Sequence, residues 1–222
     1  MASRTAVIAG ATGLVGRHLL QQLLEDEAYE RVVVLVRKPL GQTHTKLEVR
    51  EVDFDRLAEQ ARDLGVRDAF CALGTTIKTA GSEGAFRKVD FTYVHELAKA
   101  VRQGADQFLL VSALGASPTS RVFYNRTKGE IEEAVKALEF PGTHFFRPSY
   151  LVGERSERRI AEKVGTAFAH VAGLAMKRIR PIEARVVAAA MIRTAKTGLG
   201  GVHVYESDRI QEIYDKTIKA GR

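Results

Sequence analysis

Short apolar runs alternate with amphipathic stretches along the first 150 residues of the chain. The apolar runs predict six strands, at 5–10, 31–37, 46–54, 68–74, 107–114 and 143–149. Several of these runs lack polar alternation, which is typical of parallel strands covered on both faces. Helical periodicity between them predicts helices at 14–26, 55–64, 84–103 and 123–139. The order predicts an α/β fold, a doubly wound parallel sheet with helices on both faces.

The pattern changes after residue 150. Two helical stretches are predicted at 155–173 and 182–196, then a strand at 201–206 and a last helix at 207–219. Neither an internal repeat nor a low-complexity linker interrupts the chain. We therefore expect a single domain, residues 1–222, in which 151–222 caps the substrate side of the sheet's C-terminal edge.

A glycine-rich loop, "GATGLVG" at 10–16, follows the first strand and opens the first helix. Gly10 and Gly13 allow a tight turn and a close approach of backbone N–H groups to a pyrophosphate, and Gly16 lets the helix pack against the strand. The positive end of the helix dipole then faces the phosphates. This context predicts a Rossmann-type dinucleotide site, with contacts from Gly10, Thr12, Gly13, Leu14, Val15 and Gly16.

The end of the second strand bears on which dinucleotide is bound. NAD-binding proteins of this type place Asp or Glu about 20 residues past the glycine loop, where it binds the ribose 2′-hydroxyl. Here "LVRKP" puts Arg37 and Lys38 at that place. Two cations suit a 2′-phosphate, so NADP(H) is favoured over NAD(H). The alternative is a basic loop that contacts nothing.

Two further strand ends reach the same edge of the sheet, where ligands bind in such folds. Asp53 and Phe54 follow the third strand, where the adenine is expected. The turn "LGTT" follows the fourth strand and brings Leu73, Gly74 and Thr75 beside the cofactor.

Candidate catalytic residues follow the fifth strand. Ser112 ends that strand, and "VFYNRTKGE" carries Tyr124 and Lys128, which share one face of a helix about one turn apart. The pair alone fits either an acid with a tuning cation or two residues of a solvated helix. Beside a nicotinamide, Lys128 would favour the phenolate and donate to the ribose hydroxyls. Tyr124 would protonate a carbonyl oxygen as hydride arrives, while Ser112 holds that oxygen.

Together, "GATGLVG", Ser112, "YNRTK" and the strand order resemble the short-chain dehydrogenases/reductases over nearly the whole chain. More closely, "LVRKP", "CALGTTIKTAGS" and "FRPSYLVGER" are similar to an atypical branch, the Tat-interacting oxidoreductase-like proteins and bacterial NAD(P)H-binding or nucleoside-diphosphate-sugar epimerase-like proteins. The resemblance implies NADP(H) binding and a Ser112, Tyr124 and Lys128 triad. It also implies that "RPSYL" touches the nicotinamide end through Arg147, Pro148 and Leu151.

The chain departs from this superfamily in two respects. An Asn that orders a proton-relay water in many members has no assignable counterpart. Only about 70 residues follow position 150, which argues against a bulky nucleotide-sugar pocket.

Composition narrows the partners. The net charge is +7, but the basic residues are spread out and not interleaved with aromatics, so nucleic acid has the least support. The six histidines and one cysteine lack metal-ligand spacing, which predicts no metal. No apolar run approaches the roughly 18 residues of a membrane span, and no signal peptide is recognisable. We therefore expect a cytoplasmic protein that does not enter membranes.

The sequence thus favours an NADP(H)-dependent oxidoreductase acting on a small carbonyl or alcohol substrate. The alternative is a regulatory protein that senses NADP(H) with little or no turnover. Helices 84–103 and 123–139 offer a face for a homodimer. The substrate and the direction of the reaction are not specified by the sequence.

Overall fold

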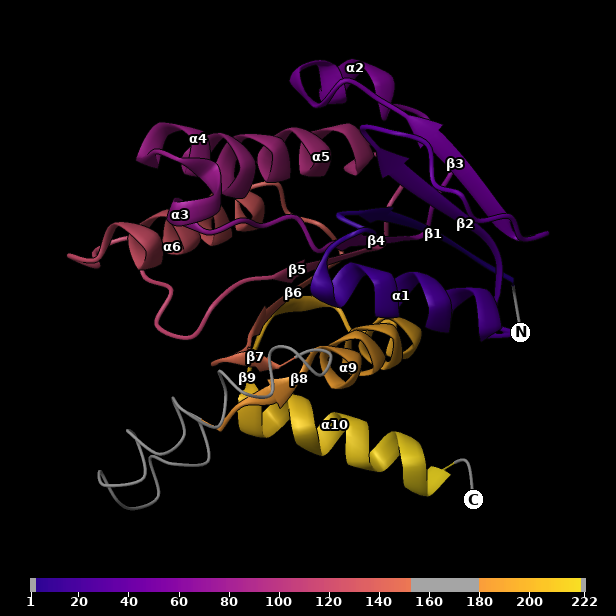
Figure 1. Cartoon of the computed structure of the whole chain (residues 1–222). Helices are drawn as coiled ribbons and strands as arrows, with labels where there is room; N and C mark the ends of the chain where they lie inside the picture. The colour runs from indigo at the N-terminus through magenta and orange to yellow at the C-terminus, as the bar shows by residue number, and fades with distance from the viewer. Residues whose placement is uncertain (1–2, 153–179, 221–222) are drawn as a thin grey trace.

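The computed structural model describes residues 3–152 and 180–220. Its main sheet has seven parallel strands in the order β3-β2-β1-β4-β5-β6-β9 (Figure 1). These are β1 (Arg4–Ala9), β2 (Tyr29–Val36), β3 (Leu47–Glu51), β4 (Asp68–Cys71), β5 (Gln107–Val111), β6 (Gly142–Arg147) and β9 (Gly201–Glu206). The predicted doubly wound α/β fold is confirmed.

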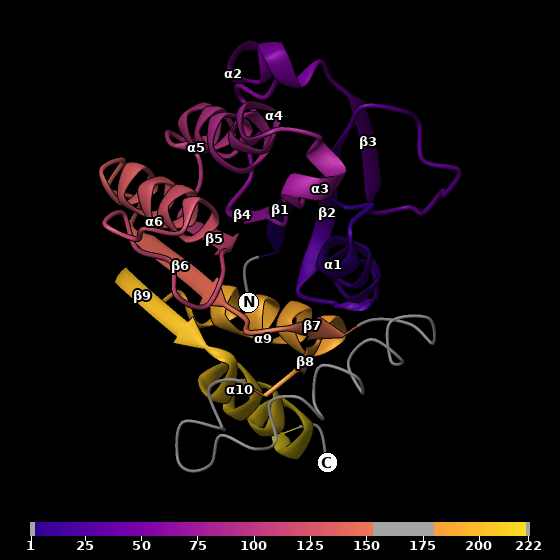
Figure 2. The same cartoon turned by 60° about the vertical axis from the view of Figure 1, so that its left-hand side comes forward.

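Helices cover both faces of this sheet (Figures 1 and 2). One face carries α1 (Leu14–Glu25) and α9 (Ala184–Thr197), with α10 (Ser207–Ala220) against α9 and β9. The other carries α2 (Leu57–Gln60), α5 (Val94–Val101) and α6 (Phe123–Lys136). Each layer of helices encloses its own hydrophobic core, so the central strands are buried from both sides.

The strand β2 shows why alternation is missing from the sequence. Val32 and Val34 point into the core beneath α1 and α9, whereas Val33 and Leu35 point into the core beneath α2 and α5. Successive side chains of a strand face opposite sides of the sheet. Because both sides are covered by helices, every position from Val32 to Val36 is apolar.

Several elements are shorter than predicted. The strands β4 and β5 end at Cys71 and Val111, because the chain leaves the sheet there, and the residues that follow form loops at the sheet's C-terminal edge. The predicted helix 55–64 is reduced to a 3₁₀ turn, η1 (Phe54–Arg56), and α2. A short helix, α3 (Ile77–Ala80), forms within the polar loop after β4.

The predicted helix 84–103 is divided into three parts. It begins as α4 (Glu83–Arg87), becomes a π-helix, η2 (Lys88–Tyr93), and continues as α5. A π-helical turn inserts an extra residue per turn and so rotates the side chains within it relative to a regular helix. The face of this segment therefore cannot be extrapolated from regular helical spacing.

The last part of the chain completes the sheet. The strand β9 pairs with β6 along its whole length, from Gly142 opposite Gly201 to Arg147 opposite Glu206. A two-stranded sheet joins β7 (Leu151–Val152) to β8 (Ile182–Glu183). The predicted helix 155–173 lies outside the described residues.

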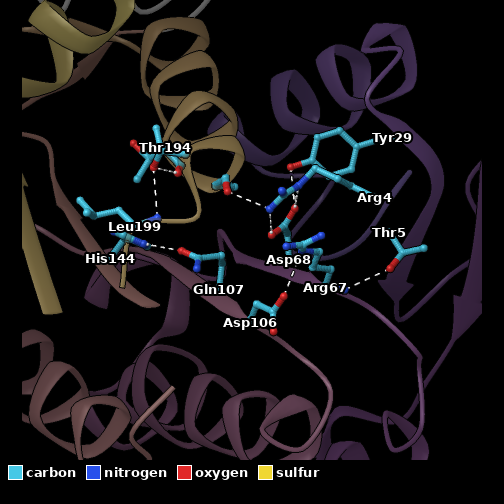
Figure 3. Close-up of polar contacts among 12 residues, drawn as sticks. Arg4, Thr5, Tyr29, Arg67, Asp68, Asp106, Gln107, His144, Thr194 and Leu199 are labelled. Atoms are coloured by element: carbon cyan, nitrogen blue, oxygen red, sulfur yellow. Dashed lines mark hydrogen bonds and ion pairs between the residues drawn. The ribbon is translucent and has the colours of Figure 1, made fainter. Parts of the chain in front are cut away.

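Buried polar groups gather at the amino end of the strands (Figure 3). The Arg4 guanidinium donates to both carboxylate oxygens of Asp68, at 2.7 and 2.6 Å, and to the Ala195 carbonyl oxygen at 2.8 Å. The Tyr29 hydroxyl donates to the same carboxylate at 2.8 Å. These contacts join β1, β2, β4 and α9 at the edge opposite the glycine loop. They therefore do not occupy the C-terminal edge, where a ligand can bind.

Candidate functional site

The glycine loop has the backbone geometry that a phosphate site requires. Gly10 has a φ of 89°, and a Cβ there would lie 2.5 Å from the Ala72 carbonyl carbon. A Cβ on Gly16 would overlap the Gly10 carbonyl oxygen. Gly13 occupies the N-cap of α1 and has no side chain with which to cap the helix. The loop therefore holds β1 and α1 close together and leaves the helix N-terminus open to an anion.

Two adjoining cavities run along the loop at the C-terminal edge of the sheet. The larger, of about 510 Å³, lies between the glycine loop and the end of β2, and the smaller, of about 130 Å³, continues past the end of β4 toward η2. Gly10, Thr12, Arg37, Phe54 and Leu73 line both of them. Four of these shared residues, Gly10, Arg37, Phe54 and Leu73, follow the carboxyl ends of β1, β2, β3 and β4.

Arg37 and Lys38 lie at the wall of the larger cavity, and both are exposed. Phe54 is buried in the floor, with its ring centroid 5.4 Å from that of Tyr93. The carboxylate of Asp53, predicted to lie at the adenine, accepts from the Asp55 N–H at 2.9 Å and caps η1. Asp53 is not among the residues that line either cavity.

Lys128 forms a buried ion pair at this edge. Its Nζ lies 2.7 Å from Asp90 Oδ1, and the two side chains are only 4% and 1% exposed. The second oxygen of Asp90 accepts from the Thr75 N–H at 2.9 Å. Burial opposes the charged form of Lys128, but the Asp90 carboxylate and the Tyr124 phenol outweigh burial, and the pKa of Lys128 is raised.

The pair lies directly behind the turn that lines the smaller cavity. A Cβ on Gly74 would be 3.5 Å from Asp90 Oδ1 and 3.9 Å from Lys128 Nζ. Gly74 itself is exposed and lines that cavity. The ion pair therefore lies within van der Waals distance of a residue that lines the smaller cavity.

Tyr124 lies one helical turn before Lys128 at the start of α6 and is half-buried. Its ring packs 5.3 Å from the ring of Phe86, on α4. Tyr124 and Lys128 thus lie one turn apart on α6, and the Tyr124 phenol is near enough to the Lys128 ammonium to favour its charged form.

Ser112 makes contacts that the sequence did not predict. Its hydroxyl donates to the Glu132 carboxylate, which also accepts from the Arg147 guanidinium, with Arg147 Nε at 3.0 Å. Ser112 is 5% exposed. This buried network joins β5, β6 and α6, and the pKa of Arg147 is raised by its hydrogen bonds to Glu132.

The remaining predicted contacts separate into two groups. Leu14, Val15 and Gly16 form the first turn of α1, as expected for residues beside a pyrophosphate. Pro148 is buried and accepts from the Leu114 N–H at 3.0 Å, while Leu151 packs against the core beneath α1 and α9. Neither of these two residues is among those that line the two cavities.

Sequence reasoning missed three residues of the site: Asp90, Val89 and Tyr93. The last two line the smaller cavity, and all three come from the π-helix η2. The sequence did contain one signal for Asp90, which lies four residues after Phe86 and four residues before Val94, both of them buried. An acid on the apolar face of a helix indicates a buried partner.

Within residues 3–152 and 180–220, no cluster of three or more His, Cys, Asp or Glu side chains is arranged to hold a metal ion. Nor does any helix in those ranges combine the length and the apolar character needed to cross a bilayer. Cys71 is buried in β4, and burial raises the pKa of its thiol to about 12.

The fold and the loop define a nucleotide-binding protein of the NAD(P) class, and comparison with known proteins agrees. Residues 10–170 match the NAD(P)H-binding family, to which the chain belongs. Protein FMP52, mitochondrial, of Debaryomyces hansenii is 40% identical over 156 residues, with 69% of each chain covered. Protein HTATIP2 of Rattus norvegicus is 35% identical over 175 residues, covering 76% of this chain and 71% of the relative.

The predicted likeness to atypical short-chain dehydrogenases/reductases is confirmed by these relatives and by solved structures. A short-chain dehydrogenase from Burkholderia cenocepacia in complex with NADP has a TM-score of 0.67 and 18% identity, with 99% of this chain and 97% of that chain covered. At that identity the likeness concerns the fold. The predicted cytoplasmic location is wrong, because the FMP52 relatives are named as mitochondrial proteins.

Proposed function

We propose that this protein is an NADP(H)-dependent oxidoreductase that exchanges a hydride with a small carbonyl or alcohol substrate. The adenosine and its 2′-phosphate occupy the larger cavity beside Arg37 and Lys38. The pyrophosphate lies at the start of α1. The nicotinamide lies over Gly74, where Lys128 donates to the ribose hydroxyls and Tyr124 exchanges a proton with the substrate oxygen.

One observation carries this proposal. The buried ammonium of Lys128 lies next to Gly74, which lines a cavity that extends along the glycine loop to Arg37. The proposed site needs a phosphate cradle, a cation at the ribose and an acid within reach of the substrate oxygen. These three groups follow one another along the same edge.

The cofactor preference is tested by substituting Arg37→Ala. A guanidinium bonded to a 2′-phosphate contributes about 1.5–3 kcal/mol, so the variant should lose roughly ten- to a hundredfold in NADPH affinity and little in NADH affinity. Arg67→Ala is the matched control, because Arg67 forms an exposed ion pair with Asp106 near the opposite edge. Equal affinity of the unaltered protein for NADPH and NADH would refute the preference.

The chemistry is tested by NADPH oxidation across a panel of small aldehydes and ketones. Tyr124→Phe should abolish turnover and leave NADPH binding largely intact, since the ring still packs against Phe86. Binding without oxidation of any carbonyl by the unaltered protein would count against the oxidoreductase.

A second candidate, a protein that senses NADP(H) with little turnover, is favoured by the contacts of Ser112. A hydroxyl that donates to Glu132 is engaged and must rotate before it can hold a substrate oxygen. If Ser112→Ala leaves turnover unchanged, Ser112 serves the Glu132 network only. If the unaltered protein binds NADPH and shows no turnover, the sensor is the better description.

A further inference from the structure

The charge balance of the Lys128 and Asp90 pair has a consequence for which form of the cofactor the site accepts. Both side chains are almost fully buried, 2.7 Å apart. Removing two charges from water is costly, and the mutual attraction of a buried pair often fails to offset that cost. Stability alone therefore does not explain why this ion pair is buried, and we look for a function of the pair.

Three elements hold the pair next to Gly74, which lines the smaller cavity. Lys128 comes from α6, Asp90 from the π-helix η2, and the turn after β4 contributes the Thr75 N–H that fixes the second oxygen of Asp90. A Cβ on Gly74 would lie 3.5 Å from Asp90 Oδ1 and 3.9 Å from Lys128 Nζ. Both charges thus lie close to the expected place of the nicotinamide.

The two redox states of the cofactor differ in charge at that place. The oxidised nicotinamide ring carries a positive charge, the reduced ring is neutral, and the adenosine and phosphate groups are the same in both. An unpaired ammonium near the ring would repel the oxidised form, and burial would leave this repulsion weakly screened. A carboxylate in contact with the ammonium cancels most of that field.

We propose that Asp90 sets the redox selectivity of the cofactor site, by neutralising Lys128 so that the oxidised and reduced cofactors bind with similar affinity. Asp90 is a positioning residue in this scheme, because it acts on the cofactor through Lys128. The inference rests on the proposed function, which places the nicotinamide beside Lys128. It predicts a charge effect of definite sign for each member of the pair.

The test measures the dissociation constants of NADP⁺ and NADPH by calorimetry for the full chain and three variants. In Asp90→Asn the ammonium is uncompensated, so the ratio of the NADP⁺ constant to the NADPH constant should rise, on the order of tenfold. In Lys128→Gln the carboxylate is uncompensated, and the ratio should fall. In the double variant both charges are absent, and the ratio should return close to that of the unaltered protein.

Glu130→Gln is the matched control. Glu130 also belongs to α6 and also pairs across to the preceding helical segment, through Arg87 on α4, but this pair is partly exposed. Its removal should leave the ratio unchanged. Circular dichroism of each variant establishes that it is folded. If Asp90→Asn does not fold, the direction in which the ratio changes in Lys128→Gln decides whether the inference holds.

The outcomes separate this inference from the proposed function. If the unaltered protein binds both forms and every variant weakens both equally, Asp90 has a structural role only, and the inference is overturned while cofactor binding stands. A shift of the same sign in both single variants also overturns it. If the unaltered protein binds neither form, the proposed function fails, and this inference fails with it.

Discussion

His144 should make the stability of the protein depend on pH. The side chain is fully buried in β6, where its Nε2 lies 2.7 Å from Gln107 Oε1 (Figure 3). Its Nδ1 lies 3.2 Å from the Tyr205 hydroxyl. Because Gln107 Oε1 can only accept, Nε2 carries the proton and Nδ1 accepts from Tyr205. This is the hydrogen-bonding pattern of a neutral imidazole.

Burial, with a smaller contribution from the nearby His203, lowers the pKa of His144 from 6.5 to about 4. The unfolded chain therefore binds more protons than the folded chain between these two values, and stability falls as the pH falls from 6.5 toward 4. The full pKa shift of His144 corresponds to about 3 kcal/mol in the free energy of unfolding. About 2 kcal/mol of it should be lost by pH 5.

The assay is urea denaturation at pH 8 and pH 5 of the unaltered protein and of His144→Gln. The variant should be less stable at pH 8, because Tyr205 and Gln107 lose part of their hydrogen bonding. Between pH 8 and pH 5, the free energy of unfolding of the variant should nevertheless fall by about 2 kcal/mol less than that of the unaltered protein. His44→Gln serves as the control, because His44 is exposed and its removal should leave the pH dependence intact.

The refuting result is an equal loss of stability between pH 8 and pH 5 in the unaltered protein and in His144→Gln. The imidazole would then titrate alike in the folded and unfolded chains. The source of any acid sensitivity would have to be sought among the buried carboxylates instead.

Three further predictions concern other parts of the fold. Asp68→Asn should destabilise the protein by about 3 kcal/mol or more, because it breaks a buried ion pair, whereas Asp106→Asn, in an exposed ion pair, should cost less than about 1 kcal/mol in the same denaturation assay. Cys71 should resist a thiol reagent in the native protein and react after denaturation, as followed by mass spectrometry, because the thiol is buried with its pKa raised to about 12. Gly10→Ala should abolish NADPH binding, measured by calorimetry, since the added methyl group would collide with the backbone of Ala72; undiminished binding would contradict the geometry of the loop.

Much of the fold could be predicted because it is encoded locally. A continuous apolar run such as that of β2 indicates a strand that is covered on both faces of the sheet, and this run can be read directly from the sequence. The glycine loop is also encoded locally, because its turn requires a positive φ at residue 10 and glycine adopts that conformation without strain. Arg37 could be placed at the cavity because a parallel sheet brings its strand ends to one edge.

Some contacts and elements could not be predicted, for physical reasons. The place of Asp53 after β3 predicts a contact with the adenine but does not reveal that its carboxylate also accepts from the backbone of η1. Short acidic side chains often bond the backbone two residues further on, in competition with a ligand. The predicted helix 84–103 contains a π-helical turn, which the regular spacing of its apolar residues does not reveal.

The sequence by itself determined the order of strands and helices, the phosphate loop and the place of Tyr124 and Lys128 on one helix face. These follow from short-range patterns, since periodicity and glycine geometry act within a few residues. Only the tertiary structure decided that Lys128 pairs with Asp90 and that the Ser112 hydroxyl donates to Glu132. Those partners come from separate elements, and the packing of helices on the sheet, rather than any local preference, brings their side chains into contact.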